Sequence, residues 1–167
     1  AQMSPEATAI VVKYIEEIKD YLSVTGDDKS PLIESVPKEV DETYIQELSK
    51  LTLSKEAVEK CGKDLKLVYT PVHGSGYVPV MTILKKLGIN VTVVEEQTVK
   101  DTEFSTVKVP NPEFKETLSM GIDLANKIKA DVVFGTDPDS DRLGVAVKDD
   151  KGEFIALSGN QVGILLL

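Results

Sequence analysis

The chain has 167 residues, 41% of them hydrophobic, and a formal net charge of −9. This size suits one hydrophobic core with at most a short appended segment, and the acidic balance argues against nucleic acid or an anionic membrane surface as a partner. Any bound phosphate is therefore expected to be held locally. One cysteine, Cys61, excludes an internal disulfide, and no apolar run reaches the roughly 18 residues of a membrane span. With no basic and then apolar leader, the cytoplasm is the expected compartment.

The N-terminal part of the chain shows helical periodicity in two places. Ser4 and Pro5 form an N-cap and first-turn pair, and apolar residues then recur at helical spacing up to Ile18. Residues 24–41 are rich in turn formers, and residues 41–53 resume a helical pattern. The sequence therefore predicts a helix, a turn-rich connection and a second helix.

The remainder of the chain alternates β-branched strands with amphipathic helices. The expected elements are a strand at 65–71, a helix at 76–88, a strand at 89–96, a helix at 115–130, a buried strand at 131–135 and a hairpin at 143–157 that turns at residues 150–152. This alternation predicts an α/β fold, namely a three-layer α/β/α sandwich around a mixed, mostly parallel sheet. Because the chain opens without Met and stops inside an apolar run, we expect it to be a piece of a longer protein.

The stretch GTDPDSDRLG, which follows the predicted buried strand, concentrates like charges. Asp137, Asp139 and Asp141 stand at alternate positions, which share one face in extended backbone. The carboxyl end of a buried strand is where open α/β folds place their ligand sites. A divalent cation would remove the repulsion between the carboxylates, and a site without His or Cys favours Mg²⁺ or another oxygen-preferring ion over zinc.

Arg142 directly follows the third aspartate and changes the charge balance of this loop. With a divalent ion bound, the charges of the three aspartates, the ion and Arg142 nearly cancel. The loop could then accept a phosphate that the ion alone or Arg142 alone would hold poorly. A solvated surface run is the alternative, and the buried preceding strand and the adjacent arginine argue against it. A calcium loop of the EF-hand type is excluded because Arg142 and Lys148 stand where Gly and Glu are required.

A glycine-bearing turn, YTPVHGSGYVPV at residues 69–80, lies between a predicted strand and a predicted helix, whose N–H groups could face an anion. It does not fit a dinucleotide fingerprint, which needs glycine at Pro79, nor a nucleophile elbow, which needs glycines where His73 and Tyr77 flank Ser75. His73, the only histidine, is a candidate substrate-binding residue. The alternative is that it hydrogen-bonds the loop backbone.

Four segments between residues 69 and 167 resemble those of the α-D-phosphohexomutases, the phosphoglucomutase and phosphomannomutase family. GTDPDSDRLGVAV resembles the metal-binding loop, YTPVHGSGYVPV the YTPLHGxG turn, PNPEF the PNPE segment, and LSGNQVGILLL the LTGNQ start of the following domain. The family has four domains around one cleft. The resemblance implies that residues 1–156 are the second, metal-binding domain and that residues 157–167 begin the third.

The resemblance also implies an activity for the parent protein. A phosphoserine on the first domain would exchange a phosphoryl group with a hexose monophosphate through a hexose bisphosphate, with the first, third and fourth domains as partners. The three aspartates would bind Mg²⁺, and Arg142 would contact the transferred phosphoryl group. Since Val72 precedes the only histidine, the Ser-His pair of the family's phosphoserine segment is missing, and we expect the chain alone to be inactive.

The chain departs from many family members at two positions of the metal loop. Pro138 and Ser140 stand where those members carry glycines. This departure fits a phosphoglucomutase-like or a phosphopentomutase-like branch and leaves the sugar open. A non-catalytic metal-binding or interaction module with the same fold remains an alternative, whereas a D-x-D phosphatase accounts poorly for Asp141 and Arg142.

Overall fold

The structure of the chain is a computed structural model, and it describes residues 2–23, 25–26 and 29–167. The chain divides into two compact units, residues 1–37 and residues 38–167. Part of the predicted turn-rich connection, at residues 24, 27 and 28, lies outside the described residues. Across the part that is described, no helix combines the length and the apolar character needed to cross a membrane.

In the smaller unit, helix α1 (Pro5–Glu17) begins where the sequence predicts it. Its N-cap is Ser4, whose side chain accepts a hydrogen bond from the backbone N–H of Ala7 at 3.3 Å. A single 3-10 turn, η1 (Tyr21–Ser23), follows. Within the described residues α1 buries none of its side chains, and Ile10 is 58% exposed. The predicted helix is confirmed, and its apolar face remains exposed to solvent.

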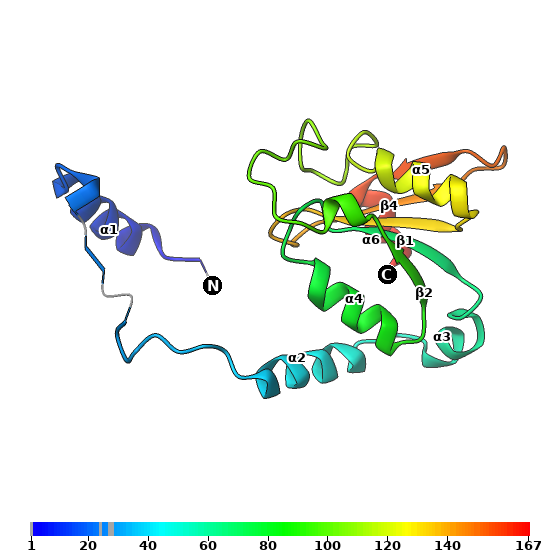
Figure 1. The fold of residues 1–167 in the computed structure, drawn as a ribbon, viewed down its shortest axis with the longest axis horizontal. Helices are drawn as coiled ribbons and strands as arrows, with labels where there is room; N and C mark the ends of the chain where they lie inside the picture. Colours follow the sequence, from blue (N-terminus) through cyan, green and yellow to red (C-terminus); the bar gives the residue numbers. More distant parts are fainter. Residues whose placement is uncertain (1, 24, 27–28) are drawn as a thin grey trace. The chain divides into compact units, whose positions relative to one another are not determined.

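The larger unit contains a five-stranded sheet and the helices around it (Figure 1). Its elements are α2 (Lys38–Lys50), α3 (Lys55–Cys61), β1 (Lys66–Thr70), α4 (Tyr77–Lys86), β2 (Asn90–Val93), η2 (Glu95–Gln97), α5 (Ser119–Ile128), β3 (Val132–Thr136), β4 (Leu143–Lys148), β5 (Phe154–Leu157) and α6 (Gly159–Leu165). The predicted strands and helices are present in the predicted order. The short helices α3 and α6 and the 3-10 turn η2 are not among the elements whose bounds were predicted from the sequence.

Four predicted boundaries differ from the structure by three or more residues. Helix α2 begins at Lys38 and ends at Lys50, each three residues before the predicted position, and an acidic Glu39 in its first turn suits the positive end of the helix. The strand predicted to extend to residue 96 ends at Val93, where the chain enters η2. The helix predicted from residue 115 begins at Ser119, because the residues before it form turns in which Thr117 donates to the carbonyl oxygen three residues earlier.

The sheet has the strand order β2-β1-β3-β4-β5. Strand β1 pairs in parallel with both β2 and β3, whereas β4 pairs antiparallel with β3 and with β5. Four of the five strands therefore run in one direction, and the predicted mixed, mostly parallel sheet is confirmed. Since β1 and β3 are parallel neighbours, with Thr70 opposite Gly135, the loops that follow them leave the same edge of the sheet.

Alternating side chains of β1 and β3 fill two cores, one on each face of the sheet. Val68 and Val133 point to the face covered by α5, where both are fully buried with Leu118. Leu67 and Tyr69 point to the opposite face, which α4 covers. This period of two is the reason that a buried parallel strand is apolar along its whole length. The three-layer α/β/α architecture is confirmed within residues 38–167.

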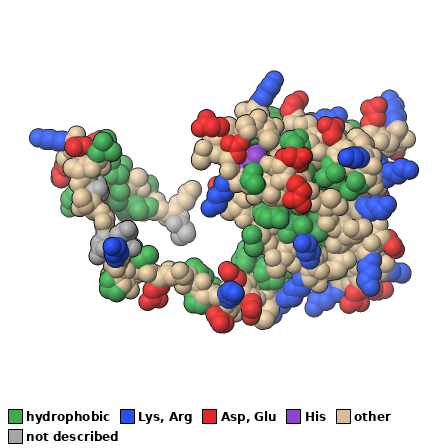
Figure 2. Space-filling model, in the orientation of Figure 1, with side chains coloured by type: hydrophobic (Ala, Val, Ile, Leu, Met, Phe, Trp, Pro, Cys, Tyr) green, Lys and Arg blue, Asp and Glu red, His purple; other side chains and the backbone are tan. Residues whose placement is uncertain are grey.

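Helix α2 packs against the outer side of α4. The two helices line an apolar groove that includes Tyr44, Ile45, Val78 and Pro79. In Figure 2, hydrophobic side chains gather over α4 on the visible face of the larger unit. The lining of this groove does not include Asp137, Asp139 or Asp141, so it is separate from the acidic loop.

The hairpin between β4 and β5 turns where the sequence predicts. Oδ1 of Asp149 accepts hydrogen bonds from the backbone N–H groups of Lys151 and Glu153, both at 2.9 Å. Gly152 has φ 82°, a left-handed conformation that glycine adopts without steric cost. The aspartate and the glycine together explain why these residues reverse the chain.

Candidate metal centre

Two loops leave the sheet side by side at the carboxyl ends of β1 and β3. The turn 71–76 follows β1, and the aspartate loop, defined here as residues 137–142, follows β3. The backbone N–H of Ser75 donates to the carbonyl oxygen of Pro138 at 2.9 Å, and the Ser75 hydroxyl donates to the same oxygen at 3.1 Å. Two motifs that lie more than sixty residues apart in the sequence are therefore hydrogen-bonded to each other.

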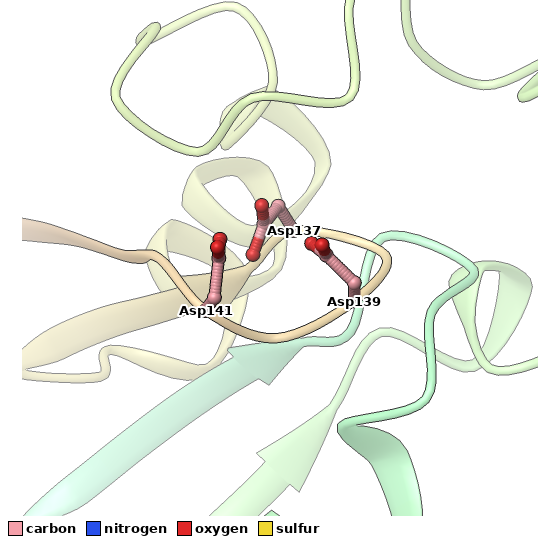
Figure 3. A group of neighbouring side chains, drawn as sticks. All are labelled: Asp137, Asp139 and Asp141. Atoms are coloured by element: carbon pink, nitrogen blue, oxygen red, sulfur yellow. The ribbon is translucent and has the colours of Figure 1, made fainter. Parts of the chain in front are cut away.

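The structure brings the three aspartates of the loop together. One carboxylate oxygen from each of Asp137, Asp139 and Asp141 lies within 4.8 Å of the other two, and Figure 3 shows the three carboxylates gathered on one side of the loop. Asp137 is buried, and the other two are exposed. The loop is tightened and not extended, because it closes as a turn in which Ser140 has φ 63° and donates its N–H to the Asp137 carbonyl oxygen at 3.0 Å, and this brings the carboxylate oxygens closer together.

The three carboxylates repel one another in the absence of a cation. The pKa of Asp141 is raised, chiefly by the negative charge of Asp139 and then by that of Asp137, and the charge of Arg142 opposes this only in part. A bound cation would interact favourably with all three carboxylates at once. The electrostatics of the loop therefore favour a cation.

The donor set of the loop fits Mg²⁺. Carboxylate oxygens are the ligands that this ion prefers, and the cluster contains neither histidine nor cysteine. Two oxygens on one octahedral Mg²⁺ lie about 3.0 Å apart when adjacent and about 4.2 Å apart when opposite, because each lies about 2.1 Å from the ion. The three carboxylate oxygens lie within 4.8 Å of one another, so any pair near this limit must move closer to share one ion. Binding of the ion by these residues remains a prediction.

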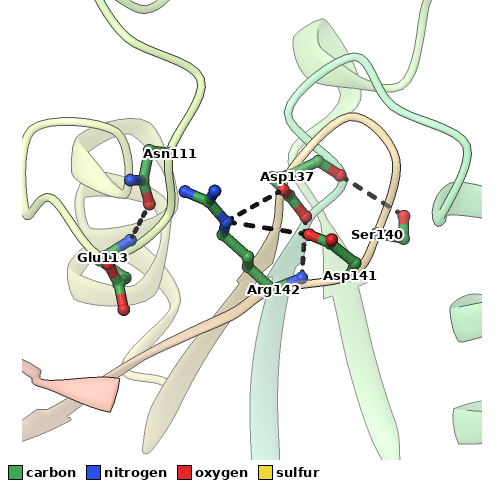
Figure 4. A network of polar contacts seen from close by, with 6 residues as sticks. All are labelled: Asn111, Glu113, Asp137, Ser140, Asp141 and Arg142. Carbon is green, nitrogen blue, oxygen red and sulfur yellow. Dashed lines mark hydrogen bonds and ion pairs between the residues drawn. The ribbon is translucent and has the colours of Figure 1, made fainter. Parts of the chain in front are cut away.

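Arg142 lies at the rim of the aspartate loop (Figure 4). Its backbone N–H donates to Oδ1 of Asp137 at 3.0 Å, which fixes the start of β4 relative to the buried aspartate. Its Nε lies 3.8 Å from a carboxylate oxygen of Asp137 and 3.8 Å from one of Asp141. These ion pairs are too long for hydrogen bonds. Within the described residues, the two terminal guanidinium nitrogens donate no hydrogen bond, and the side chain is 55% exposed.

The segment 111–113, part of the predicted PNPEF motif, lies next to the beginning of β4. Oδ1 of Asn111 accepts a hydrogen bond from the Glu113 N–H at 3.0 Å, as Figure 4 shows. Pro112 is fully buried, and its carbonyl group occupies the space that a side chain at Gly144 would need. The sequence motifs thus meet around one end of the sheet. From the sequence, they were related to one another only through their common resemblance to one family.

The glycines of the turn 71–76 allow it to approach the aspartate loop. A Cβ atom at Gly74 would overlap the backbone of Pro138 and lie 2.6 Å from its carbonyl oxygen. A Cβ atom at Gly76 would lie 2.6 to 2.8 Å from the side-chain oxygens of Ser140, Tyr69 and Thr136. The glycines here serve close packing between two loops.

The hydroxyl of Tyr69 is part of this packing. It lies 2.8 Å from Oγ1 of Thr136, and burial raises the pKa of Tyr69. A buried phenol that must remain hydrogen-bonded ties the end of β1 to the end of β3. Sequence reasoning missed this pair, because the two residues show their proximity only through the pairing of the strands.

Both ring nitrogens of His73 have hydrogen-bond partners in the segment 98–106. Its Nδ1 lies 2.8 Å from the carbonyl oxygen of Val99, and its Nε2 lies 2.7 Å from Oγ1 of Thr106. The ring also packs edge-to-face against Phe104. A hydrogen bond to backbone, the kind of contact left open by the sequence, is observed here, but its partner is the Val99 carbonyl oxygen of another segment and not the turn that carries His73. A contact between His73 and substrate remains a prediction.

This architecture defines a class of protein: an α/β/α domain with an acidic site at the carboxyl end of its central strands. Residues 42–152 match the family model described as phosphoglucomutase/phosphomannomutase, alpha/beta/alpha domain II. The chain therefore belongs to the phosphoglucomutase/phosphomannomutase family and represents its second domain.

Comparisons with known proteins support this assignment. The chain is 36% identical to a phosphoglucomutase of Staphylococcus aureus strain MRSA252 over 171 residues and 39% identical to one of Staphylococcus epidermidis over 175 residues. All of the chain is covered in both comparisons, and it spans 30% and 31% of those proteins. A crystal structure of a phosphoglucomutase/phosphomannomutase family protein from Burkholderia thailandensis superposes with a TM-score of 0.52 at 28% identity, covering 70% of this chain and 23% of that one.

Proposed function

We propose that this chain is the metal-binding second domain of a phosphoglucomutase or phosphomannomutase. Residues 1–156 would form that domain, and residues 157–167 would begin the third. Because the chain spans about 30% of the phosphoglucomutases it matches, the activity belongs to the longer parent protein. The observation that carries the proposal is the gathering of three carboxylates within 4.8 Å beside an exposed arginine.

The parent enzyme is proposed to be an isomerase of the intramolecular phosphotransferase type. It would move a phosphoryl group between the C1 and C6 hydroxyls of a hexose phosphate, through a phosphoserine on its first domain and a hexose bisphosphate. Its partners would be the hexose phosphate and, for this chain, domains I, III and IV. Its proposed compartment is the cytoplasm.

In this scheme Asp137, Asp139 and Asp141 hold Mg²⁺. When bound, the ion supplies positive charge that stabilises the phosphoryl group during transfer. Arg142 contacts the oxygens of the same group through its terminal guanidinium nitrogens, which form a planar fork that suits a phosphoryl group. Its Nε, directed at two aspartates, holds the fork in place.

Calorimetric titration of the 167-residue chain with Mg²⁺ tests the metal site. We expect weak binding, because three carboxylates without a phosphoserine oxygen leave coordination positions to water. Asp139→Asn should weaken the affinity at least about tenfold, since it removes one charged ligand from the ion. Asp123→Asn, the same change at an exposed position of α5, is the matched control. Sub-micromolar binding, or equal affinity in the Asp139 variant and the wild type, would contradict the proposal.

A coupled mutase assay of the parent and of the chain tests the activity. The parent should interconvert hexose phosphates, and the chain alone should not exceed a control without protein. Turnover of pentose phosphates by the parent in place of hexose phosphates would identify a phosphopentomutase-like member. A parent that binds Mg²⁺ but turns over neither substrate would favour a non-catalytic metal-binding or interaction module.

A further inference from the structure

A chain of buried and half-buried hydrogen bonds runs from the end of β1 through the segment 97–106. The Val72 N–H donates to Oγ1 of Thr70 at 3.1 Å, and the Thr70 hydroxyl donates to Oε1 of Gln97. Nε2 of Gln97 donates to Oγ1 of Thr106 at 2.9 Å, and that oxygen lies 2.7 Å from Nε2 of His73. Thr70 and Gln97 are fully buried and His73 is 7% exposed, whereas Thr106 is half-buried. The bond that Oγ1 of Thr70 accepts and the bond that its hydroxyl donates are therefore shielded from water more fully than the two bonds at Thr106.

The partners of His73 indicate which ring nitrogen carries the proton. The carbonyl oxygen of Val99 can only accept, so Nδ1 is the donor to it. The Thr106 hydroxyl already accepts from Gln97, and its hydrogen has no other acceptor among the described residues than Nε2 of His73. With the proton at Nδ1, each of these hydrogen bonds has one donor and one acceptor.

This network holds the turn that supports the aspartate loop. The backbone N–H of His73 donates to the carbonyl oxygen of Gln97 at 2.9 Å, which fastens the turn 71–76 to η2. Two residues further on, Ser75 donates twice to the carbonyl oxygen of Pro138. Pro138 stands between Asp137 and Asp139, so a movement of the turn would change the distance between their carboxylates.

We propose that His73 is a positioning residue for the metal centre, which acts through Thr106, Gln97 and the turn 71–76. By fixing Pro138, the network sets the spacing of the aspartate carboxylates and thereby the preference of the loop for Mg²⁺ over Ca²⁺. The inference rests on the proposed function, because it requires the aspartate loop to bind Mg²⁺. The segment 98–106, which contributes no metal ligand, becomes a determinant of metal selectivity.

The two ions differ in their tolerance of displaced ligands. Mg²⁺ requires nearly ideal octahedral geometry, whereas Ca²⁺ accepts a variable number of oxygens at longer and more variable distances. A loosened loop should therefore lose Mg²⁺ affinity and largely keep Ca²⁺ affinity. A merely destabilised domain behaves differently, since unfolding of a fraction of the molecules lowers both apparent affinities by the same factor.

The test measures Mg²⁺ and Ca²⁺ affinities of the 167-residue chain by calorimetry, at a temperature where circular dichroism shows every variant to be folded. Thr106→Val removes the hydroxyl between Gln97 and His73 at nearly constant volume. Thr117→Val is the matched control, because Thr117 is buried and its hydroxyl donates at 2.8 Å to the Val109 carbonyl oxygen, away from the turn. His73→Ala removes the ring, and His73→Asn keeps an amide that can donate to Val99.

We expect Thr106→Val and His73→Ala to lower the ratio of Mg²⁺ to Ca²⁺ affinity at least about threefold, below the tenfold or greater losses known for groups that bond directly to metal ligands. Thr117→Val should leave the ratio unchanged, and His73→Asn should restore part of it. If the wild type binds Mg²⁺ and the ratio in Thr106→Val equals that of the wild type, this inference alone is overturned. If the wild type binds no Mg²⁺, the proposed function fails and the inference fails with it.

The position of the proton on the His73 ring can be measured in the absence of metal, which gives a second test. The chain has one histidine, so a long-range ¹H–¹⁵N correlation spectrum reports this ring without assignment ambiguity. We expect the neutral ring to carry its proton on Nδ1 and not on Nε2, and the pattern should change in Thr106→Val but not in Thr117→Val. A ring protonated at Nε2 would overturn the proposed network.

Discussion

The two loops at the carboxyl edge of the sheet use their polar groups in opposite ways. In the turn 71–76, the polar side chains are satisfied within the protein: both nitrogens of His73 and the hydroxyl of Ser75 have partners. In the aspartate loop, Asp139 and Asp141 are exposed, and the terminal nitrogens of Arg142 donate no hydrogen bond within the described residues. The difference fits a supporting role for the turn 71–76 and, under the proposed function, a ligand-binding role for the aspartate loop.

The largest effect should come from separating the two loops. Gly74→Ala places a methyl group against the backbone of Pro138, which cannot move like a flexible side chain. We expect a loss of about 2–3 kcal/mol in the free energy of unfolding, measured with urea, together with loss of Mg²⁺ binding. Gly163→Ala is the control, since a Cβ atom there has no neighbour within 4 Å. Equal stability of the two variants would show that the loops can separate without cost.

The buried and the exposed aspartates should respond differently to removal. Asp137→Ala leaves the Arg142 N–H without its acceptor, so the free energy of unfolding should fall by about 1–3 kcal/mol while metal binding is lost. Asp139→Ala should also weaken Mg²⁺ binding, but it should leave the stability unchanged or slightly raised, because like-charge repulsion is relieved. Urea unfolding and calorimetry on both variants measure this contrast. A matching loss of stability in Asp139→Ala would mean that its side chain is a structural element.

Arg142→Lys in the full-length parent separates contact with the phosphoryl group from support of the loop. Lysine keeps the charge but loses the planar fork, so kcat should fall at least about tenfold, equivalent to about 1.4 kcal/mol of transition-state stabilisation, with little change in metal affinity. Steady-state kinetics at several Mg²⁺ concentrations provide the measurement. Recovery of most of the rate at saturating Mg²⁺ would instead assign Arg142 to holding the loop.

The smallest effect should be a pH dependence of stability. The pKa of Asp141 is raised in the folded state by Asp139 and Asp137, so the folded chain holds this proton more tightly than the unfolded chain does. Stability should therefore decline slightly as the pH rises through the range just above the ordinary pKa of an aspartate, and it should recover as the pH falls again. Melting temperatures of the wild type and Asp139→Asn test this, and an equally steep pH dependence in the variant would exclude the repulsion as its cause.

Most of the secondary structure and the acidic site could be predicted from the sequence, because both depend on neighbouring residues. The capping Ser4, the β-branched runs of β1 and β3, and the aspartate and glycine of the β4–β5 turn act within a few residues of themselves. The alternation of Asp137, Asp139 and Asp141 is equally local. The early end of β2 was missed because Val94 has a strand-like side chain and its N–H still bonds the Tyr69 carbonyl oxygen, while its own carbonyl oxygen accepts from the Gln97 N–H and so begins η2.

The tertiary structure decided that the polar groups of the turn 71–76 bond within the protein while most of the charged side chains of the aspartate loop remain exposed. From the sequence, the turn 71–76 was compatible with an anion site. A glycine that leaves space for a ligand cannot be distinguished in the sequence from a glycine that leaves space for another segment of backbone. The packing of Gly74 against Pro138 and the bonds from His73 to Val99 and Thr106 join residues 26 to 64 positions apart. No local pattern encodes such pairs. They form only because β1 and β3 lie parallel and adjacent, so that their carboxyl ends direct both loops to the same place.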